Sequence, residues 1–183
     1  MPLPSEKLYT AEDYWNLPDQ ERAELIHGKL YAMAPPKRIH QEISMGLSSF
    51  FSTFIREHGG KCRVYAAPFA VNLDADDEIY VEPDLCIVCD SKKLTEKGCK
   101  GAPDLVVEIV SDGSRRMDYS TKNTLYSDAG VREYWIIDPA KQRSTVYCYE
   151  EDAAPLIIPF DQPIVSHIFG GMRVVVKDLA PKT

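Results

Sequence analysis

Glu108 interrupts the apolar segment LVVEIV, which has the composition of a strand that is buried on both faces. A carboxylate buried there without a partner would cost several kcal/mol in lost hydration or would be forced into its neutral form. Asp84 raises the same problem in VEPDLCIVC, directly after Pro83 and at the start of the preceding apolar strand. Both acids therefore need compensation from a cation or from hydrogen-bond donors.

Two carboxylates on neighbouring strands match the needs of Mg²⁺, which takes oxygen ligands at about 2.0–2.1 Å and keeps several waters. A metal held in this way lowers the pKa of a bound water and neutralises charge on a phosphate that is being cleaved. The residues alone leave an equal alternative, in which Asp84 and Glu108 are separately tied to buried Lys, Arg or backbone donors.

Lys122 favours the metal-site interpretation. The sequence predicts a helix from Asp112 or Ser114 to about residue 129, because Gly130 stands just past that end. One stripe of this helix comprises Asp118, Lys122, Leu125 and Ala129. If the stripe packs on the Glu108 strand, the ammonium points at the carboxylates and orients a water or stabilises charge in the transition state. The alternative is a weak surface pair with Asp118 one turn earlier.

The segments around these residues indicate an α/β architecture. We expect a short helix at 10–17, a hairpin that turns at Gly28, and a long helix at 39–54. Strand-like segments are expected at 62–73, 79–90, 103–111, 131–138, 144–149 and 172–179. This order predicts a central mixed sheet flanked by helices.

Composition limits the functional classes. A chain of 183 residues with 44% hydrophobic residues fits one domain, which we place at 1–183. Neither a membrane span nor a secretory leader is recognisable, so we expect a cytoplasmic protein without membrane contact. The net charge of −7 argues against a protein that coats nucleic acid through bulk charge. A nuclease is still allowed, because a bound cation supplies the largest local charge.

The five cysteines predict reduced thiols, since their number is odd and no secretory context accompanies them. Cys86 and Cys89 have the spacing of a zinc knuckle, but they lie in an apolar strand-like run. Strand alternation would direct the two side chains to opposite faces, which argues against a shared zinc ion.

Several motifs together resemble a known family. Pro83 and Asp84, followed by Glu108 after 23 residues, resemble the PD-(D/E)XK nuclease superfamily. The segment 101–139, GAPDLVVEIVSDGSRRMDYSTKNTLYSDAGVREYWIIDP, closely resembles the Uma-two family of restriction-endonuclease homologues, a family carrying a domain of unknown function. The segments AELIHGKLYAM, HQEIS and EPDLCIVCD match that family in order, so the resemblance covers about residues 8–178.

The resemblance implies a restriction-endonuclease-like fold in which Asp84 and Glu108 bind Mg²⁺, with Mn²⁺ as a substitute and a strand carbonyl near Ile109 as a further ligand. The superfamily places a lysine two residues after the glutamate, where this chain has Val110. A helix lysine that matches Lys122 looks like its replacement in the Uma-two family.

By the same resemblance, Glu24 matches an acid near the metal, and His40 matches a family histidine at the start of the long helix. We therefore count both with the catalytic site. The alternatives are that Glu24 faces solvent from its strand and that His40 only caps or pairs locally.

The leading hypothesis is a Mg²⁺-dependent endonuclease that acts on DNA as a homodimer. A rival hypothesis is an inactive module with the nuclease fold that binds nucleic acid or a protein partner. This hypothesis is favoured by Val110, which stands where the superfamily has a lysine, and by the net negative charge of the chain. A glycosidase with two carboxylates is weaker, because it gives Lys122 no role.

Overall fold

The computed structural model describes residues 7–74, 76–151 and 153–179, and two mixed sheets organise them. The first sheet contains, in spatial order, β12 (Leu156–Pro159), β11 (Arg143–Cys148), β10 (Glu133–Asp138), β9 (Leu105–Ile109), β6 (Leu85–Val88) and β3 (Arg63–Ala66). The second contains β2 (Lys29–Ala32), β1 (Ala23–Ile26), β5 (Ile79–Val81), β4 (Val71–Asn72), β8 (Gly98–Lys100) and β7 (Leu94–Thr95). A third, small sheet pairs β13 (Pro163–Val165) with β14 (Arg173–Val175).

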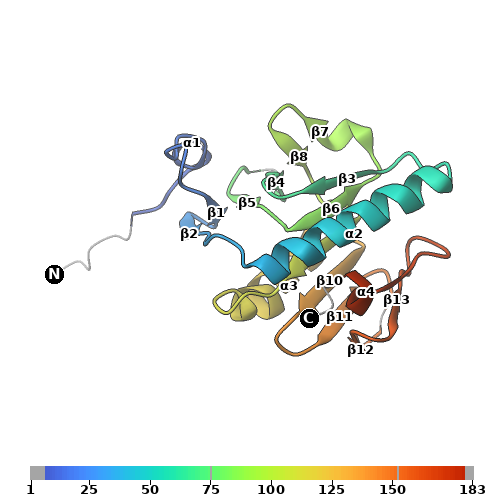
Figure 1. The fold of residues 1–183 in the computed structure, drawn as a ribbon. Helices are drawn as coiled ribbons and strands as arrows, with labels where there is room; N and C mark the ends of the chain where they lie inside the picture. The colour runs from blue at the N-terminus through green and yellow to red at the C-terminus, as the bar shows by residue number, and fades with distance from the viewer. Residues whose placement is uncertain (1–6, 75, 152, 180–183) are drawn as a thin grey trace.

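The helices lie around these sheets. They are α1 (Ala11–Trp15), α2 (Arg38–Glu57), the 3₁₀ turn η1 (Ser91–Lys93), the π-helix η2 (Met117–Lys122), α3 (Asn123–Ala129) and α4 (Val176–Leu179). In Figure 1, α2 lies in front of β6 and β10, while α1, β1 and β2 lie to the left. No helix in the part of the chain just described has the length and apolarity that a membrane crossing requires.

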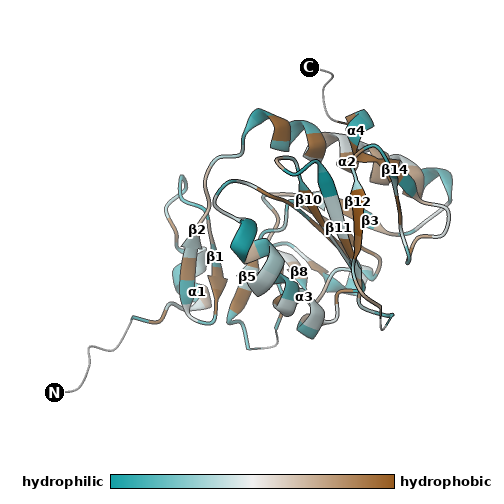
Figure 2. Cartoon of the chain, turned by 90° about the horizontal axis from the view of Figure 1, so that it is seen from below, coloured by the Kyte–Doolittle hydropathy of each residue, from teal (hydrophilic) through white to brown (hydrophobic). Residues whose placement is uncertain are grey.

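Helix α2 covers one face of the first sheet. Its buried residues Ile43, Leu47, Phe51 and Ile55 recur at helical spacing and pack on the inward side chains of β6, β9 and β10. The ribbon of α2 in Figure 2 accordingly alternates between teal and brown. The other face of the first sheet packs against the second sheet and α3, in a cluster that includes Val106, Leu125 and Tyr126. The predicted central mixed sheet between helices is therefore confirmed.

Two of the predicted strands are each divided between the sheets. The segment 62–73 forms β3 and β4, and the segment 79–90 forms β5 and β6. The second division falls at Pro83, whose ring removes a backbone donor and ends the pairing of β5. Asp84 consequently lies at the bend where the chain passes from one sheet to the other.

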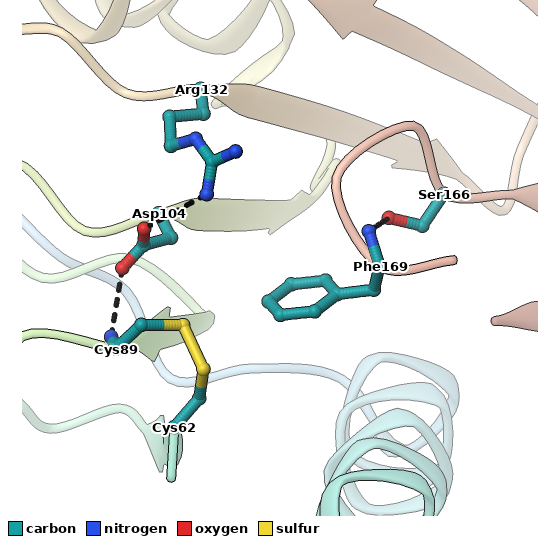
Figure 3. The surroundings of a disulfide bond; sticks show 6 residues. All are labelled: Cys62, Cys89, Asp104, Arg132, Ser166 and Phe169. Atoms are coloured by element: carbon teal, nitrogen blue, oxygen red, sulfur yellow. Dashed lines mark hydrogen bonds and ion pairs between the residues drawn. A yellow bond between two sulfur atoms is a disulfide. The ribbon is translucent and has the colours of Figure 1, made fainter. Parts of the chain in front are cut away.

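The prediction of five reduced thiols was wrong for one pair. Cys62 and Cys89 form a disulfide beside Asp104, which accepts a hydrogen bond from the Cys89 backbone N–H at 2.8 Å (Figure 3). The pair joins the residue before β3 to the residue after β6, two strands that are antiparallel neighbours although β4 and β5 separate them in the chain. Sequence spacing alone could not reveal this pairing. The predicted opposite orientation of Cys86 and Cys89 is confirmed, since Cys86 belongs to the apolar cluster on the α3 face of the sheet and Cys89 packs against the cluster on the α2 face.

Candidate active site

Strand register brings Asp84 and Glu108 together. Strand β6 runs antiparallel to β9 with Leu85 opposite Val107, so the next residues outward along this ladder are Asp84 and Glu108. The Ile109 backbone N–H donates to Asp84 Oδ2 at 2.6 Å, which fixes the carboxylate against the neighbouring strand. Asp84, directly before β6, and Glu108, in β9, therefore lie side by side at adjacent central strands, as expected.

Lys122 reaches Glu108 from the helix, as its position in the stripe predicted. Its Nζ lies 2.9 Å from Glu108 Oε1 and 2.8 Å from Glu24 Oε1, and its side chain is only 6% exposed. Asp118 is not among its ion-pair partners within the described residues, and the Asp118 carboxylate accepts a hydrogen bond from the Ser114 hydroxyl at 2.6 Å. The weak surface pair is therefore replaced by a buried bridge between two carboxylates.

Glu24 and His40 complete the group. Glu24 is 4% exposed, and its Oε1 also accepts a hydrogen bond from the Glu82 backbone at 3.0 Å, so it does not face solvent. His40, in the first turn of α2, places Nε2 3.0 Å from Asp84 Oδ1. The structure thus brings all five predicted residues to one place.

A pocket of about 430 Å³ opens at this place. Its walls come from the connection between β2 and α2, the first turns of α2, the end of β9 and the π-helix η2. Its acidic lining residues are Glu24, Asp84, Glu108 and Asp118. The cations in the lining are Lys122 and Arg22, and Arg22 is paired with Glu82, which lies outside the lining. The pocket therefore carries more negative than positive charge.

Two further residues belong to the site although the sequence did not mark them as functional. Tyr126 is fully buried and donates from its hydroxyl to Glu108 Oε1 at 2.6 Å. Asp118 lines the pocket and is 2% exposed. Both stand four residues from Lys122, and Asp118 belongs to the same predicted stripe as the lysine, whereas Tyr126 lies beside that stripe. The π-helix at 117–122 adds a wide turn at this position, as π-helical turns often do at functional sites.

Burial and charge shift the pKa values of these groups. Burial raises the pKa of Glu108 well above its usual range, and the Lys122 ammonium opposes that shift. Burial also disfavours the charge on Lys122, but the carboxylates of Glu108 and Glu24 outweigh it and raise the pKa of the lysine. The lysine therefore stays positively charged in the neutral pH range.

The donor set suits a hard divalent cation in chemistry and charge, because carboxylate oxygens are abundant and positive charge is scarce. Among the described residues, however, no three carboxylate or histidine ligand atoms of this pocket lie within 4.8 Å of one another; the one such group is Cys148, Glu151 and His167. A closed cage is not required for Mg²⁺, which is commonly held by one or two carboxylates together with water. Asp84 and Glu108 are the residues that could hold such a cation together with water.

Asp118 should make stability depend on pH. Burial raises its pKa from 3.8 to about 6, so the folded chain binds its proton more tightly than the unfolded chain. Its contribution to stability is greatest below about pH 4 and falls by about 2–3 kcal/mol as the pH rises through 6. Asp118→Asn should therefore stabilise the protein at pH 7.5 and have little effect near pH 4.

Urea unfolding of both proteins in EDTA at several pH values measures this difference. Asp128→Asn provides the control, because Asp128 is an exposed carboxylate on the same helical segment. A difference in unfolding free energy between Asp118→Asn and wild type that stays constant with pH would contradict the assignment.

Comparisons with known proteins identify the family and agree with the fold. A family model described as "Putative restriction endonuclease" matches residues 11–176. An uncharacterised protein of Synechocystis sp. is 26% identical over 152 residues, covering 81% of this chain and 78% of that protein. A crystal structure described as "a putative nuclease belonging to DUF820" from Anabaena variabilis shares the fold, with a TM-score of 0.75, 20% identity and coverage of 93% of this chain and 96% of that one. The chain belongs to the Uma-two family, whose fold is the one that its motifs predicted.

Proposed function

We propose that this protein is a Mg²⁺-dependent endonuclease that hydrolyses phosphodiester bonds in DNA, with Mn²⁺ able to replace Mg²⁺. The observation that carries the proposal is the buried ammonium of Lys122, held 2.9 Å from Glu108 in a pocket that also contains Asp84. A purely structural ion pair would not need an open pocket or an excess of carboxylates around it.

Each residue has a defined task in this proposal. Asp84 and Glu108 would hold the cation, with the carbonyl of Ile109 as a further ligand. When bound, the cation supplies an activated water and neutralises charge on the phosphate. His40 holds Asp84 in place through Oδ1, and Tyr126 holds Glu108 through Oε1. These contacts keep the two carboxylates oriented before substrate arrives.

Lys122 takes the role of the lysine that is absent after Glu108. Val110 is 7% exposed and packs in the apolar cluster against α3, so a lysine at that position would have to be buried there. The Lys122 ammonium instead enters from η2 and is positioned by Glu24 and Glu108. From there it can orient the attacking water or stabilise the developing charge on the phosphate.

Cleavage of supercoiled plasmid by the purified protein with Mg²⁺ or Mn²⁺ tests the proposal, with single-stranded DNA and RNA as alternative substrates. We expect cutting that stops on addition of EDTA and that is lost in Asp84→Asn. Calorimetry with Mg²⁺ alone provides a second measurement that does not depend on turnover.

A nuclease-fold binding module is the competing function, and Val110 is the observation that favours it. The two functions differ in their dependence on metal. A binding module should retain its affinity for nucleic acid in Asp84→Asn, and the wild type should neither cut DNA nor bind Mg²⁺. That combination of results would replace the nuclease proposal.

We also propose that the protein acts as a homodimer, because cleavage of both strands of a duplex needs two such sites. Sedimentation at micromolar concentration is expected to show a dimer. A monomer under these conditions would restrict the proposal to cutting of one strand at a time.

A further inference from the structure

A second group of potential ligands lies outside the pocket. Cys148 ends β11, Glu151 follows it in the turn, and His167 stands in the loop between β13 and β14. The ligand atoms of these three side chains all lie within 4.8 Å of one another. We propose that this group binds a Zn²⁺ ion through Cys148 Sγ, Glu151 and His167, with water completing the coordination.

The chemistry of the three ligands favours zinc over magnesium. Thiolate, imidazole and carboxylate are the groups that bind Zn²⁺ in proteins, whereas Mg²⁺ prefers oxygen ligands alone. A tetrahedral ion with bonds of about 2.0–2.3 Å holds its ligand atoms about 3.3–3.8 Å apart. His167 Nδ1 lies 3.3 Å from Glu151 Oε1, so this edge of the tetrahedron already has the required length.

The position of His167 is fixed by a buried acid. Glu133 is fully buried, and its Oε2 accepts hydrogen bonds from the backbone N–H groups of His167 and Ile168 at 3.0 and 3.1 Å and from the Ser166 hydroxyl at 2.8 Å. Glu133 is also directly opposite Cys148 in the register of β10 and β11. The same residue therefore holds the histidine loop next to the strand that carries the thiol.

The loop is anchored at its other end as well. The Phe169 backbone N–H donates to the Ser166 hydroxyl at 3.1 Å, and the Phe169 ring points from the loop toward the Cys62–Cys89 disulfide (Figure 3). Phe169 packs against the apolar cluster beneath α2. A loop that is fixed on both sides of His167 loses little conformational entropy when the histidine binds an ion.

This site is separate from the active-site pocket. Glu108 is opposite Ile136 in β10, three residues beyond Glu133, and side chains three residues apart on a strand point to opposite faces. The active site lies on the face covered by α3, whereas Glu133 and its partners lie on the α2 face. The proposed Zn²⁺ would join the turn after β11 to the loop after β13, which makes it a structural clamp.

Titration of the chelator-treated 183-residue chain with Co²⁺, in the presence of excess Mg²⁺, tests this site. Co²⁺ bound to a thiolate absorbs in the near ultraviolet, and the active-site pocket is not lined by cysteine, so Co²⁺ bound in that pocket does not give this signal. The other free thiols, Cys86 and Cys99, are buried, and Cys148→Ser tests whether Cys148 supplies the thiolate. We expect one equivalent to bind, Zn²⁺ to displace it, and Cys148→Ser or His167→Ala to weaken binding by about 100-fold or more.

Two control variants test whether the Co²⁺ absorption comes from the proposed site. His58→Ala removes an exposed histidine at the end of α2 and should leave the Co²⁺ absorption unchanged, as should Glu108→Gln in the active site. The absence of thiolate absorption at one equivalent of Co²⁺ would overturn the proposal. Absorption that persists in Cys148→Ser would also overturn it, because the thiol would then come from another cysteine.

Discussion

Replacement of Glu108 by glutamine should reduce DNA cleavage by on the order of 10³-fold or more, equivalent to about 4 kcal/mol of transition-state stabilisation. Glutamine keeps the shape of the side chain and can still accept a hydrogen bond from Tyr126, but it removes the negative charge that would hold the cation. Initial rates of plasmid nicking over a range of Mg²⁺ concentrations measure the loss.

Asp104→Asn is the matched control for Glu108→Gln. Asp104 is a carboxylate directly before the strand that carries Glu108, but it accepts a hydrogen bond from the Cys89 N–H and pairs with Arg132 (Figure 3). We expect this variant to cut DNA at the wild-type rate. Equal rates for Glu108→Gln and wild type would remove Glu108 from the mechanism.

Replacement of Lys122 by methionine should lower the free energy of unfolding by about 3–5 kcal/mol in the absence of metal. The methionine fills most of the space but leaves Glu24 and Glu108 buried without the ammonium that bridges them. Urea unfolding in EDTA measures the loss. Cleavage should also fall below detection, since the variant lacks the positive charge beside the scissile phosphate.

Mg²⁺ gives this second prediction a further test. A cation that binds the folded chain stabilises it, and Lys122→Met removes a competing positive charge from the same carboxylates. The gain in unfolding free energy on addition of Mg²⁺ should therefore be larger for Lys122→Met than for wild type. Lys93→Met is the control, because the Lys93 ammonium donates to the Ala102 carbonyl away from the pocket. An unchanged stability of Lys122→Met in EDTA would contradict the buried bridge.

The sequence predicted those site residues whose charge is unexpected in the segment that carries them. Glu108 and Asp84 were found because a charge inside a strand buried on both faces requires compensation. Lys122 was found because helical periodicity placed it on the stripe facing that strand. Glu24 and His40 came from family resemblance, since neither a strand glutamate nor a helix histidine is unusual by itself.

Tyr126 and Asp118 were missed as site residues because each fits the ordinary pattern of its surroundings. A tyrosine beside an apolar stripe fits an ordinary core position, and an aspartate four residues before a lysine fits an ordinary surface pair. Only the packing of η2 and α3 on the sheet buries Asp118 and brings the Tyr126 hydroxyl within 2.6 Å of Glu108.

The sequence by itself determined the α/β class, the long helix, the central strands and the need for compensation at Asp84 and Glu108, because these follow from local periodicity and from the cost of burying charge. The tertiary structure decided the division of two predicted strands between sheets, the Cys62–Cys89 disulfide, and the bridge of Lys122 to both Glu24 and Glu108. Each of these depends on which distant segments pack together, and the energy of such contacts is not encoded in any single segment of the chain.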